Sequence, residues 1–257
     1  MFTIARYTFV EYLRRKIVYV ILGIGAVLML CTVLAGSLAL SEQVKVIRDF
    51  WLGLIEIAGL ILVLFFWSSV LQQEITNNTI FLIASKNIKR SNVILGKFIG
   101  FSGIILFFIV LLGILYTGTA LLYHVPLLGV HYLALAGIAI KLEVLLSLCL
   151  FFASFVSPFV ALAASLVIYL LGHLMSFVVF YVTVLKKEMF SPIFALLTKL
   201  IYYIVPNFTA LSVQDFFDIP FLYSKLPQSF WFAVFFHIIY IVVILFLAVR
   251  IFNKKQF

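Results

Sequence analysis

The sequence predicts an all-α, polytopic membrane protein with six transmembrane helices, an N-terminal interfacial helix and both termini in the cytoplasm. Two uncharged apolar stretches, Phe98–Ile140 and Val144–Leu185, are each more than forty residues long. A helix crosses the hydrocarbon core in about 20 residues, so each stretch is long enough for two passes or nearly so. A soluble domain does not bury so much continuous apolar sequence, whereas a bilayer requires it.

The composition supports a single transmembrane domain over residues 1–257. Hydrophobic residues make up 66% of the chain and charged residues only 11%, against about 25% charged residues in soluble domains. Cys31 and Cys149 both lie in apolar runs, so no disulfide framework is indicated. The net charge of +9 comes from basic residues that flank the apolar runs, which favours membrane orientation and lipid contact over nucleic-acid binding.

Charges and helix breakers divide the chain into six expected spans. The first is about twice as long as the hydrophobic region of a signal peptide, so we expect it to be retained. Ser157-Pro158 predicts a tight turn between the fourth and fifth spans, because proline disfavours helix in the residue before it and begins a helix well. The expected spans are Ile17–Leu40, Trp51–Leu71, Phe98–Leu122, Gly137–Val156, Pro158–Val182 and Phe230–Arg250.

The distribution of lysine and arginine predicts the orientation. With both termini inside, eleven of the 18 basic residues lie in the cytoplasm, six lie outside and Lys141 lies within a span. Cytoplasmic segments of membrane proteins carry an excess of lysine and arginine. We therefore expect both termini in the cytoplasm.

Three segments outside the spans carry further information. Residues 1–16 have apolar side chains at helical spacing and arginines elsewhere on the helical wheel, which predicts an interfacial helix on the inner leaflet. Residues 186–229 are too polar for a complete span and contain four prolines, which predicts short re-entrant helices in the outer leaflet. The interfacial-helix prediction for residues 1–16 is based on the apolar Phe2, Ala5, Phe9 and Leu13 and on Arg6 and Arg14.

Residues 72–91 form the third segment, a cytoplasmic loop between the second and third spans. Ile75, Thr79, Leu82 and Ile83 fall on one face of a short amphipathic helix. Such a face can lie against lipid headgroups or enter a groove on a cytoplasmic partner. The pattern by itself leaves both roles open.

The motifs of this loop resemble those of the permease subunits of type-2 ABC transporters, the exporter-type family. The motifs, in chain order, are Glu74, Asn78-Thr79, Phe81-Leu82, Arg90 and Gly96-Lys97, and Pro206-Asn207-Phe208 ahead of the last span is also similar to the family. Two residues depart from the family pattern: Asn78 replaces a glycine, and Asn87 stands where a proline is frequent.

The resemblance implies a permease that pairs with a second copy or a paralogue and docks a separate ATPase on the loop of each permease. The implied docking residues are Glu74, Asn78, Thr79, Phe81, Leu82 and Arg90. Gly96-Lys97-Phe98 lacks the upstream glycine and the following Ser or Thr of a phosphate-binding loop. We therefore expect ATP and Mg²⁺ to bind to the partner chain and no enzymatic activity in this one. The resemblance also implies a location in a prokaryotic cytoplasmic membrane.

Ionisable residues inside the spans are the candidates for a substrate path. Glu56, Lys141 and Glu143 lie within expected spans, where charged groups are costly to bury. Lys141 and Glu143 are two residues apart and lie on different faces of a helix, so one of them can meet Glu56 or a second protomer instead. Structural pairing is the alternative role for all three.

His173 and His237 lie at equal depth in the last two spans, about 20 Å from the cytoplasmic face. Two histidines at one depth suit a bis-histidine haem, although membrane histidines also bond to neighbouring helices. A haem-bearing anchor of a redox complex and an ion-coupled carrier are therefore the alternatives to the exporter.

The sequence contains no motif of a catalytic or metal site. Gly96, Gly100 and Gly103, at the start of the third span, predict a close contact between helices.

Overall fold

The computed structural model describes residues 1–14, 23–27, 30–32, 34, 43–76, 90–123, 129–182, 196, 200–201, 204–213 and 228–254. Every regular element in these ranges is a helix, which confirms the all-α class. Four helices are long and apolar enough to cross a membrane, and they fit an integral membrane protein. These four are Ser91–Leu122, Gly129–Ala153, Pro158–Met175 and Phe230–Lys254.

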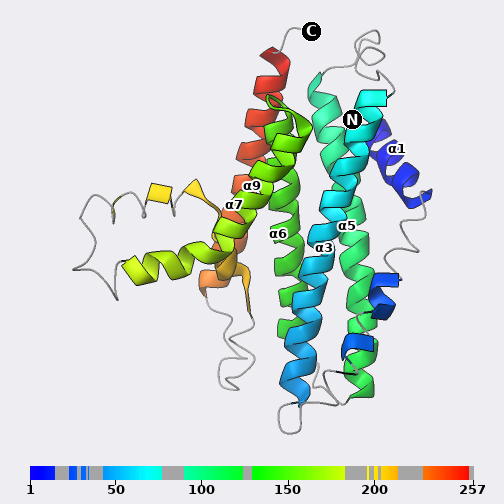
Figure 1. The fold of residues 1–257 in the computed structure, drawn as a ribbon, viewed down its shortest axis with the longest axis vertical. Coiled ribbons are helices and arrows are strands. Elements are labelled where there is room, and N and C mark those ends of the chain that lie inside the picture. Colours follow the sequence, from blue (N-terminus) through cyan, green and yellow to red (C-terminus); the bar gives the residue numbers. More distant parts are fainter. Residues whose placement is uncertain are drawn as a thin grey trace.

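The long helices form one bundle in which successive helices run in opposite directions (Figure 1). The N-terminus, the end of α3, the start of α5 and the end of α9 all lie at the same end of this bundle. The elements are α1 (Phe2–Tyr12), α3 (Gln43–Thr76), α5 (Arg90–Leu122), α6 (Gly129–Ala153), α7 (Pro158–Phe180), the 3₁₀ helix η3 (Phe208–Leu211) and α9 (Gln228–Lys254).

The helices extend beyond the spans that hydropathy predicts. Helix α5 begins at Arg90 rather than Phe98, and α6 begins at Gly129 rather than Gly137. Helix α3 extends past both ends of the predicted span. Charged residues mark where a helix leaves the hydrocarbon, but they do not end it, because they have good helix propensity.

Three of the predicted segments lie mostly outside the described residues. Of the first predicted span, residues 23–27, 30–32 and 34 are described, and they are helical. Residues 77–89 of the predicted cytoplasmic loop and most of residues 186–229 lie outside the described part.

Helix α6 is the centre of the bundle. It contacts α3, α5, α7, α9 and η3, and 78% of its apolar window is buried, against 28% for α7 and for α9. Large apolar side chains such as Phe159 of α7 and Phe232 of α9 project outward from the bundle. This distribution suits a central helix with lipid-facing helices around it.

Helix α1 packs closely against the N-terminal half of α5, over the three predicted glycines. A Cβ atom at Gly96, Gly100 or Gly103 would lie 2.9 Å, 2.7 Å and 3.1 Å from atoms of Ile4, Thr8 and Phe9, respectively. The prediction that these glycines permit a close helix contact is thereby confirmed, and the partner is α1. Residues Phe2, Arg6 and Tyr7 on the other face of α1 are exposed, as an interfacial helix requires.

Candidate functional site

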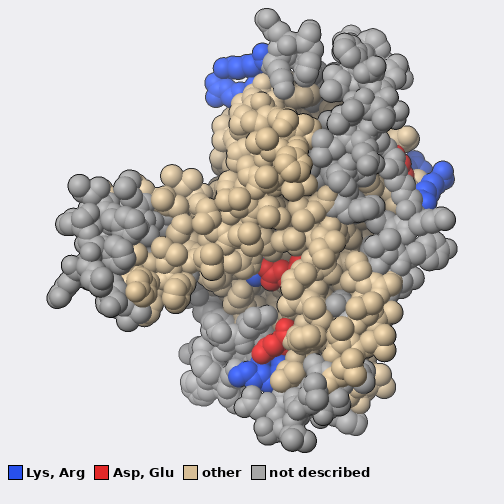
Figure 2. Space-filling model, viewed as in Figure 1, with Lys and Arg blue, Asp and Glu red and all other residues tan. Residues whose placement is uncertain are grey.

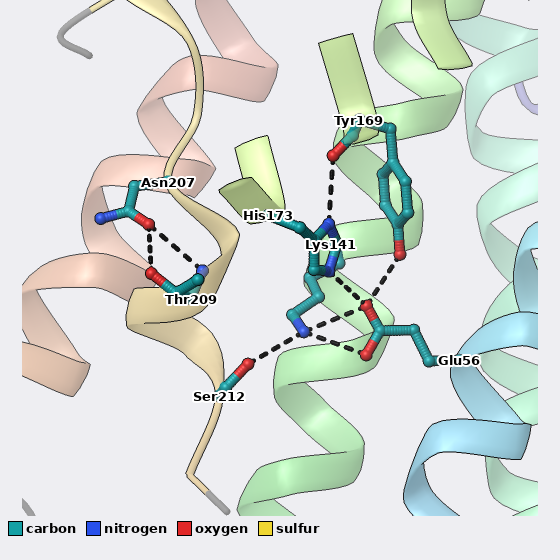
Figure 3. Close-up of polar contacts among 7 residues, drawn as sticks. All are labelled: Glu56, Lys141, Tyr169, His173, Asn207, Thr209 and Ser212. Atoms are coloured by element: carbon teal, nitrogen blue, oxygen red, sulfur yellow. Dashed lines mark hydrogen bonds and ion pairs between the residues drawn. The ribbon is translucent and has the colours of Figure 1, made fainter. Parts of the chain in front are cut away.

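A partly buried carboxylate, Glu56 of α3, is the centre of a polar cluster in the bundle (Figure 3). Lys141 Nζ of α6 donates to Glu56 Oε1 at 3.1 Å and to Oε2 at 3.0 Å. On α7, Tyr169 Oη donates to Glu56 Oε1 at 2.9 Å, and His173 Nε2 lies 2.8 Å from the same oxygen. With Ser212, these residues form what we call the Glu56 cluster, and it joins three helices.

The local sequence explains how this cluster assembles. Tyr169 and His173 are four residues apart, so α7 presents both side chains on one face. Lys141 is only 3% exposed, and a buried ammonium requires a carboxylate and hydrogen-bond acceptors around it. Of the two partners considered for Glu56, the structure selects Lys141, and the pair joins α3 to α6.

Both ring nitrogens of His173 face hydrogen-bond acceptors. Nδ1 lies 3.1 Å from the Tyr169 carbonyl oxygen, and Nε2 lies 2.8 Å from Glu56 Oε1. A neutral imidazole has only one N–H group, so only the doubly protonated ring donates to both oxygens. In that form the Glu56 carboxylate faces two cations, Lys141 and His173.

A segment that contains the short 3₁₀ helix η3, residues 205–213, inserts into the bundle beside this cluster; we call it the plug segment. Asn207 Oδ1 accepts from Thr209 N at 3.2 Å and from Thr209 Oγ1 at 2.6 Å, which caps η3 (Figure 3). Phe208 is fully buried, and its ring centroid lies 5.0 Å from that of Tyr169 and 5.2 Å from that of His173. The plug segment therefore forms part of the core.

Two glycines allow the backbone of the plug segment to approach the helices. A Cβ atom at Gly137 of α6 would lie 2.6 Å from the Leu211 carbonyl oxygen. At Gly172 of α7, it would lie 2.5 Å from the Pro206 carbonyl oxygen. Lys141 Nζ adds a hydrogen bond to Ser212 Oγ at 3.2 Å. The sequence analysis did not identify Ser212 or these glycines, although isolated glycines in apolar helices are a recognised signal of close packing.

A small cavity lies between α3, α6 and the plug segment. Its volume is about 10 Å³, enough for roughly one water molecule and far below the roughly 300 Å³ of a small-molecule pocket. Figure 2 shows acidic side chains, each with basic atoms beside it, near a hollow in the mostly uncharged middle of this face. The residues that line the cavity are Leu52, Glu56, Ala134, Ile138, Lys141, Leu211, Ser212 and Val213.

Glu143 does not join the Glu56 cluster. It lies two residues after Lys141 on another face of α6, near Ser102 of α5. Its side chain is buried, and neither carboxyl oxygen has a hydrogen-bond partner among the described residues. Glu143 therefore pairs neither with Glu56 nor with a cation in the described part of the chain.

His173 and His237 pack against the same phenyl ring. The Phe208 centroid lies 5.2 Å from that of His173 and 5.7 Å from that of His237. His237 Nδ1 bonds to the Ala233 carbonyl oxygen at 2.7 Å, while both nitrogens of His173 have partners in the Glu56 cluster. His173 is thus bonded at both ring nitrogens, whereas His237 Nε2 is buried with no hydrogen-bond partner among the described residues. The described residues also contain no group of three or more His, Cys, Asp or Glu that could hold a metal ion.

The predicted docking residues lie at one end of the bundle or outside the described residues. Glu74 is in the last turn of α3 and Arg90 is the first residue of α5, and nothing is described of their side chains. The remaining four, Asn78, Thr79, Phe81 and Leu82, lie outside the described residues.

No model of a known protein family matches this chain, and no curated protein matches it either. The functional inference therefore depends on the residues and the geometry described above.

Proposed function

We propose that this chain is the membrane-spanning permease subunit of an ATP-driven exporter of the type-2 ABC kind, in a prokaryotic cytoplasmic membrane. A separate P-loop ATPase binds ATP and Mg²⁺, and a second permease copy completes the transporter. The sequence motifs from Glu74 to Lys97, together with Pro206-Asn207-Phe208, support this assignment. The exposed apolar side chains of α7 and α9 are suited to lipid and to a second permease.

The observation that carries the proposal is the continuity of α3. This single helix, Gln43–Thr76, contains both Glu74 and Glu56. Eighteen residues separate the two, which corresponds to about 27 Å along a helix. A movement of the ATPase against the loop after α3 is thus transmitted by a continuous helix to the Glu56 cluster, which joins α3 to α6 and α7.

The cavity beside Glu56, about 10 Å³, is too small for a transported molecule. In the proposed mechanism a substrate path beside the Glu56 cluster forms when the helices rearrange or between two copies. The Glu56 cluster then links the helices that move, and the chemical identity of the substrate is left open.

The test is binding and stimulation of an ATPase. The tagged full-length chain is purified with the P-loop ATPases of its source organism, and ATP hydrolysis is measured with each. Glu74→Ala should reduce binding or stimulation at least tenfold, because removing one partner of a buried interfacial charge pair costs about 2–5 kcal/mol. Phe81→Ala should also weaken binding, because the truncated side chain no longer fills an apolar groove on the partner. Lys254→Ala, at the end of α9, is the matched control. The proposal fails if both loop variants bind and stimulate the ATPase like the wild type.

An ion-coupled carrier is the second candidate, because titratable groups in contact within a membrane helix bundle also occur in proton relays. Glu56, Tyr169 and His173 form such a chain. Reconstituted vesicles distinguish the two functions. A carrier moves its substrate with an imposed proton gradient and no ATPase, whereas an exporter requires the ATPase and ATP.

A further inference from the structure

The plug segment fills a cleft between three helices of the bundle. Its helical part, η3, contacts α6, α7 and α9, and Phe208, Leu211 and Val213 are buried there. Without the plug segment, the space occupied by these three side chains would form an open cleft beside the Glu56 cluster. The plug segment therefore determines whether this part of the bundle is closed.

Lys141 connects the plug segment to the Glu56 cluster. Its ammonium group contacts Glu56 Oε1, Glu56 Oε2 and Ser212 Oγ, at 3.1, 3.0 and 3.2 Å. A lysine ammonium has three N–H donors, so these three oxygens can use all of them. One side chain thus bonds both to the carboxylate that neutralises it and to the segment that closes the cleft.

The cavity shows where Lys141 would move if Glu56 lost its charge. An ammonium buried without a counter-charge is strongly unfavourable and must move toward water. The cavity is lined by Glu56 and Lys141 and, on the side of the plug segment, by Leu211, Ser212 and Val213. Movement of the ammonium into this cavity and away from Glu56 would therefore push against the plug segment.

We propose that residues 205–213 form a releasable plug that the Glu56–Lys141 ion pair holds in the cleft between α6, α7 and α9. The ion pair keeps Lys141 in the position from which it bonds to Ser212. Loss of the Glu56 charge leaves the Lys141 ammonium unpaired, and its movement toward water releases the plug. This conformational device requires no ATPase and no substrate, so its test is independent of the test of the proposed function.

Titratable side chains of α7 and α9 surround Lys141, Glu56 and the plug segment. Tyr169 and His173 face Glu56 from α7, and His237 of α9 packs on Phe208. Farther along α3, the Arg48–Asp49 ion pair is 2.9 Å long and involves neighbouring residues. Asp49 is therefore a matched control position, because it is an acid on the same helix that does not contact the plug segment in any of these interactions.

A cysteine at Val213 reports release of the plug. Val213 is 1% exposed, so the reporter should react slowly with a small methanethiosulfonate reagent when the plug is in place. The full-length chain is purified in detergent with Cys31→Ser and Cys149→Ser, which removes the native thiols. Glu56→Gln should raise the reaction rate at least tenfold, whereas Asp49→Asn should leave it unchanged. Leu211→Cys serves as the reporter if Val213→Cys does not fold.

A second reporter and a double variant distinguish plug release from general loosening of the fold. Thr8→Cys lies in the buried contact between α1 and α5, and its rate should not change with Glu56→Gln. Glu56→Gln combined with Lys141→Met should return the Val213→Cys rate toward the starting value, because no unpaired charge remains. The proposal is overturned if Glu56→Gln leaves the Val213→Cys rate unchanged, if both reporters accelerate equally, or if the double variant reacts as fast as Glu56→Gln alone.

Discussion

Glu56 and Lys141, 85 residues apart in the sequence, form an ion pair in which Lys141 is buried, Glu56 is partly buried, and Lys141 Nζ lies 3.0 Å from Glu56 Oε2. The pair joins the long helix α3 to the central helix α6. Because α7 adds Tyr169 and His173 to the same carboxylate, a change at Glu56 affects three helices together.

Loss of Glu56 should destabilise the bundle. Glu56→Ala leaves Lys141 as a buried cation without its carboxylate, and breaking a buried pair costs about 3–5 kcal/mol. We expect a clearly lower midpoint of thermal unfolding for the purified chain in detergent. Asp49→Asn is the comparison, because it also removes a partner of a buried cation, Arg48, but the carboxylate that it replaces is 39% exposed and joins neighbouring residues of one helix. An unfolding midpoint for Glu56→Ala equal to that of Asp49→Asn would contradict the expectation.

Gly172→Ala should also destabilise the bundle, for a steric reason. The added Cβ would lie 2.5 Å from the Pro206 carbonyl oxygen, so the backbone of the plug segment must shift. Overpacking of this kind costs about 1–3 kcal/mol. Gly53→Ala on α3 is the matched control, because nothing lies within 4 Å of a Cβ atom there. Thermal unfolding of the two variants should differ, and equal midpoints would mean that the plug segment is not packed against Gly172.

Gly100→Ala should loosen α1 from α5. Its Cβ would lie 2.7 Å from Thr8 Cβ and 3.0 Å from the Ala5 carbonyl oxygen. We expect faster thiol modification of Thr8→Cys in the Gly100→Ala variant. Gly118→Ala on the same helix is the control, since a Cβ atom there meets nothing within 4 Å. Equal rates in the two variants would show that α1 is held by contacts elsewhere.

The predicted orientation is tested by thiol labelling of intact cells. Cysteines at Ile88 and Lys255 should be protected from a membrane-impermeant reagent until the cells are opened, because the sequence places both in the cytoplasm. A cysteine at Lys225 should react from outside. Labelling at Ile88 in intact cells would reverse the orientation and remove the basis for ATPase docking at residues 72–91.

The haem alternative is tested by absorbance. The purified chain should show no Soret band, because both nitrogens of His173 are bonded within the protein and Phe208 packs against both histidines. The spectra of His173→Ala and His237→Ala should match that of the wild type. A stoichiometric Soret band that both substitutions abolish would support the function of a haem-bearing redox anchor over that of an exporter permease.

Hydropathy predicted the helical class and the long apolar helices, because helix length and bilayer thickness are linked. Proline predicted the turn before Pro158, because it disfavours helix in the residue before it and begins a helix well. Hydropathy also identified Glu56, Lys141 and His173, since ionisable groups are costly in a membrane. The glycines at 96, 100 and 103 were likewise recognised by their spacing. These properties are local, so residue type and order are sufficient to predict them.

The tertiary structure alone decided which of these residues meet. Lys141 rather than Glu143 pairs with Glu56, because the rotation of α6 within the bundle directs one side chain to α3 and the other toward α5. The role of Gly172 depends on Pro206 of the plug segment, which lies more than thirty residues later in the sequence. The role of Ser212 depends on Lys141, which is 71 residues away. Such contacts form between surfaces distant in the sequence, and hydrophobic periodicity carries no information about which surfaces pack together.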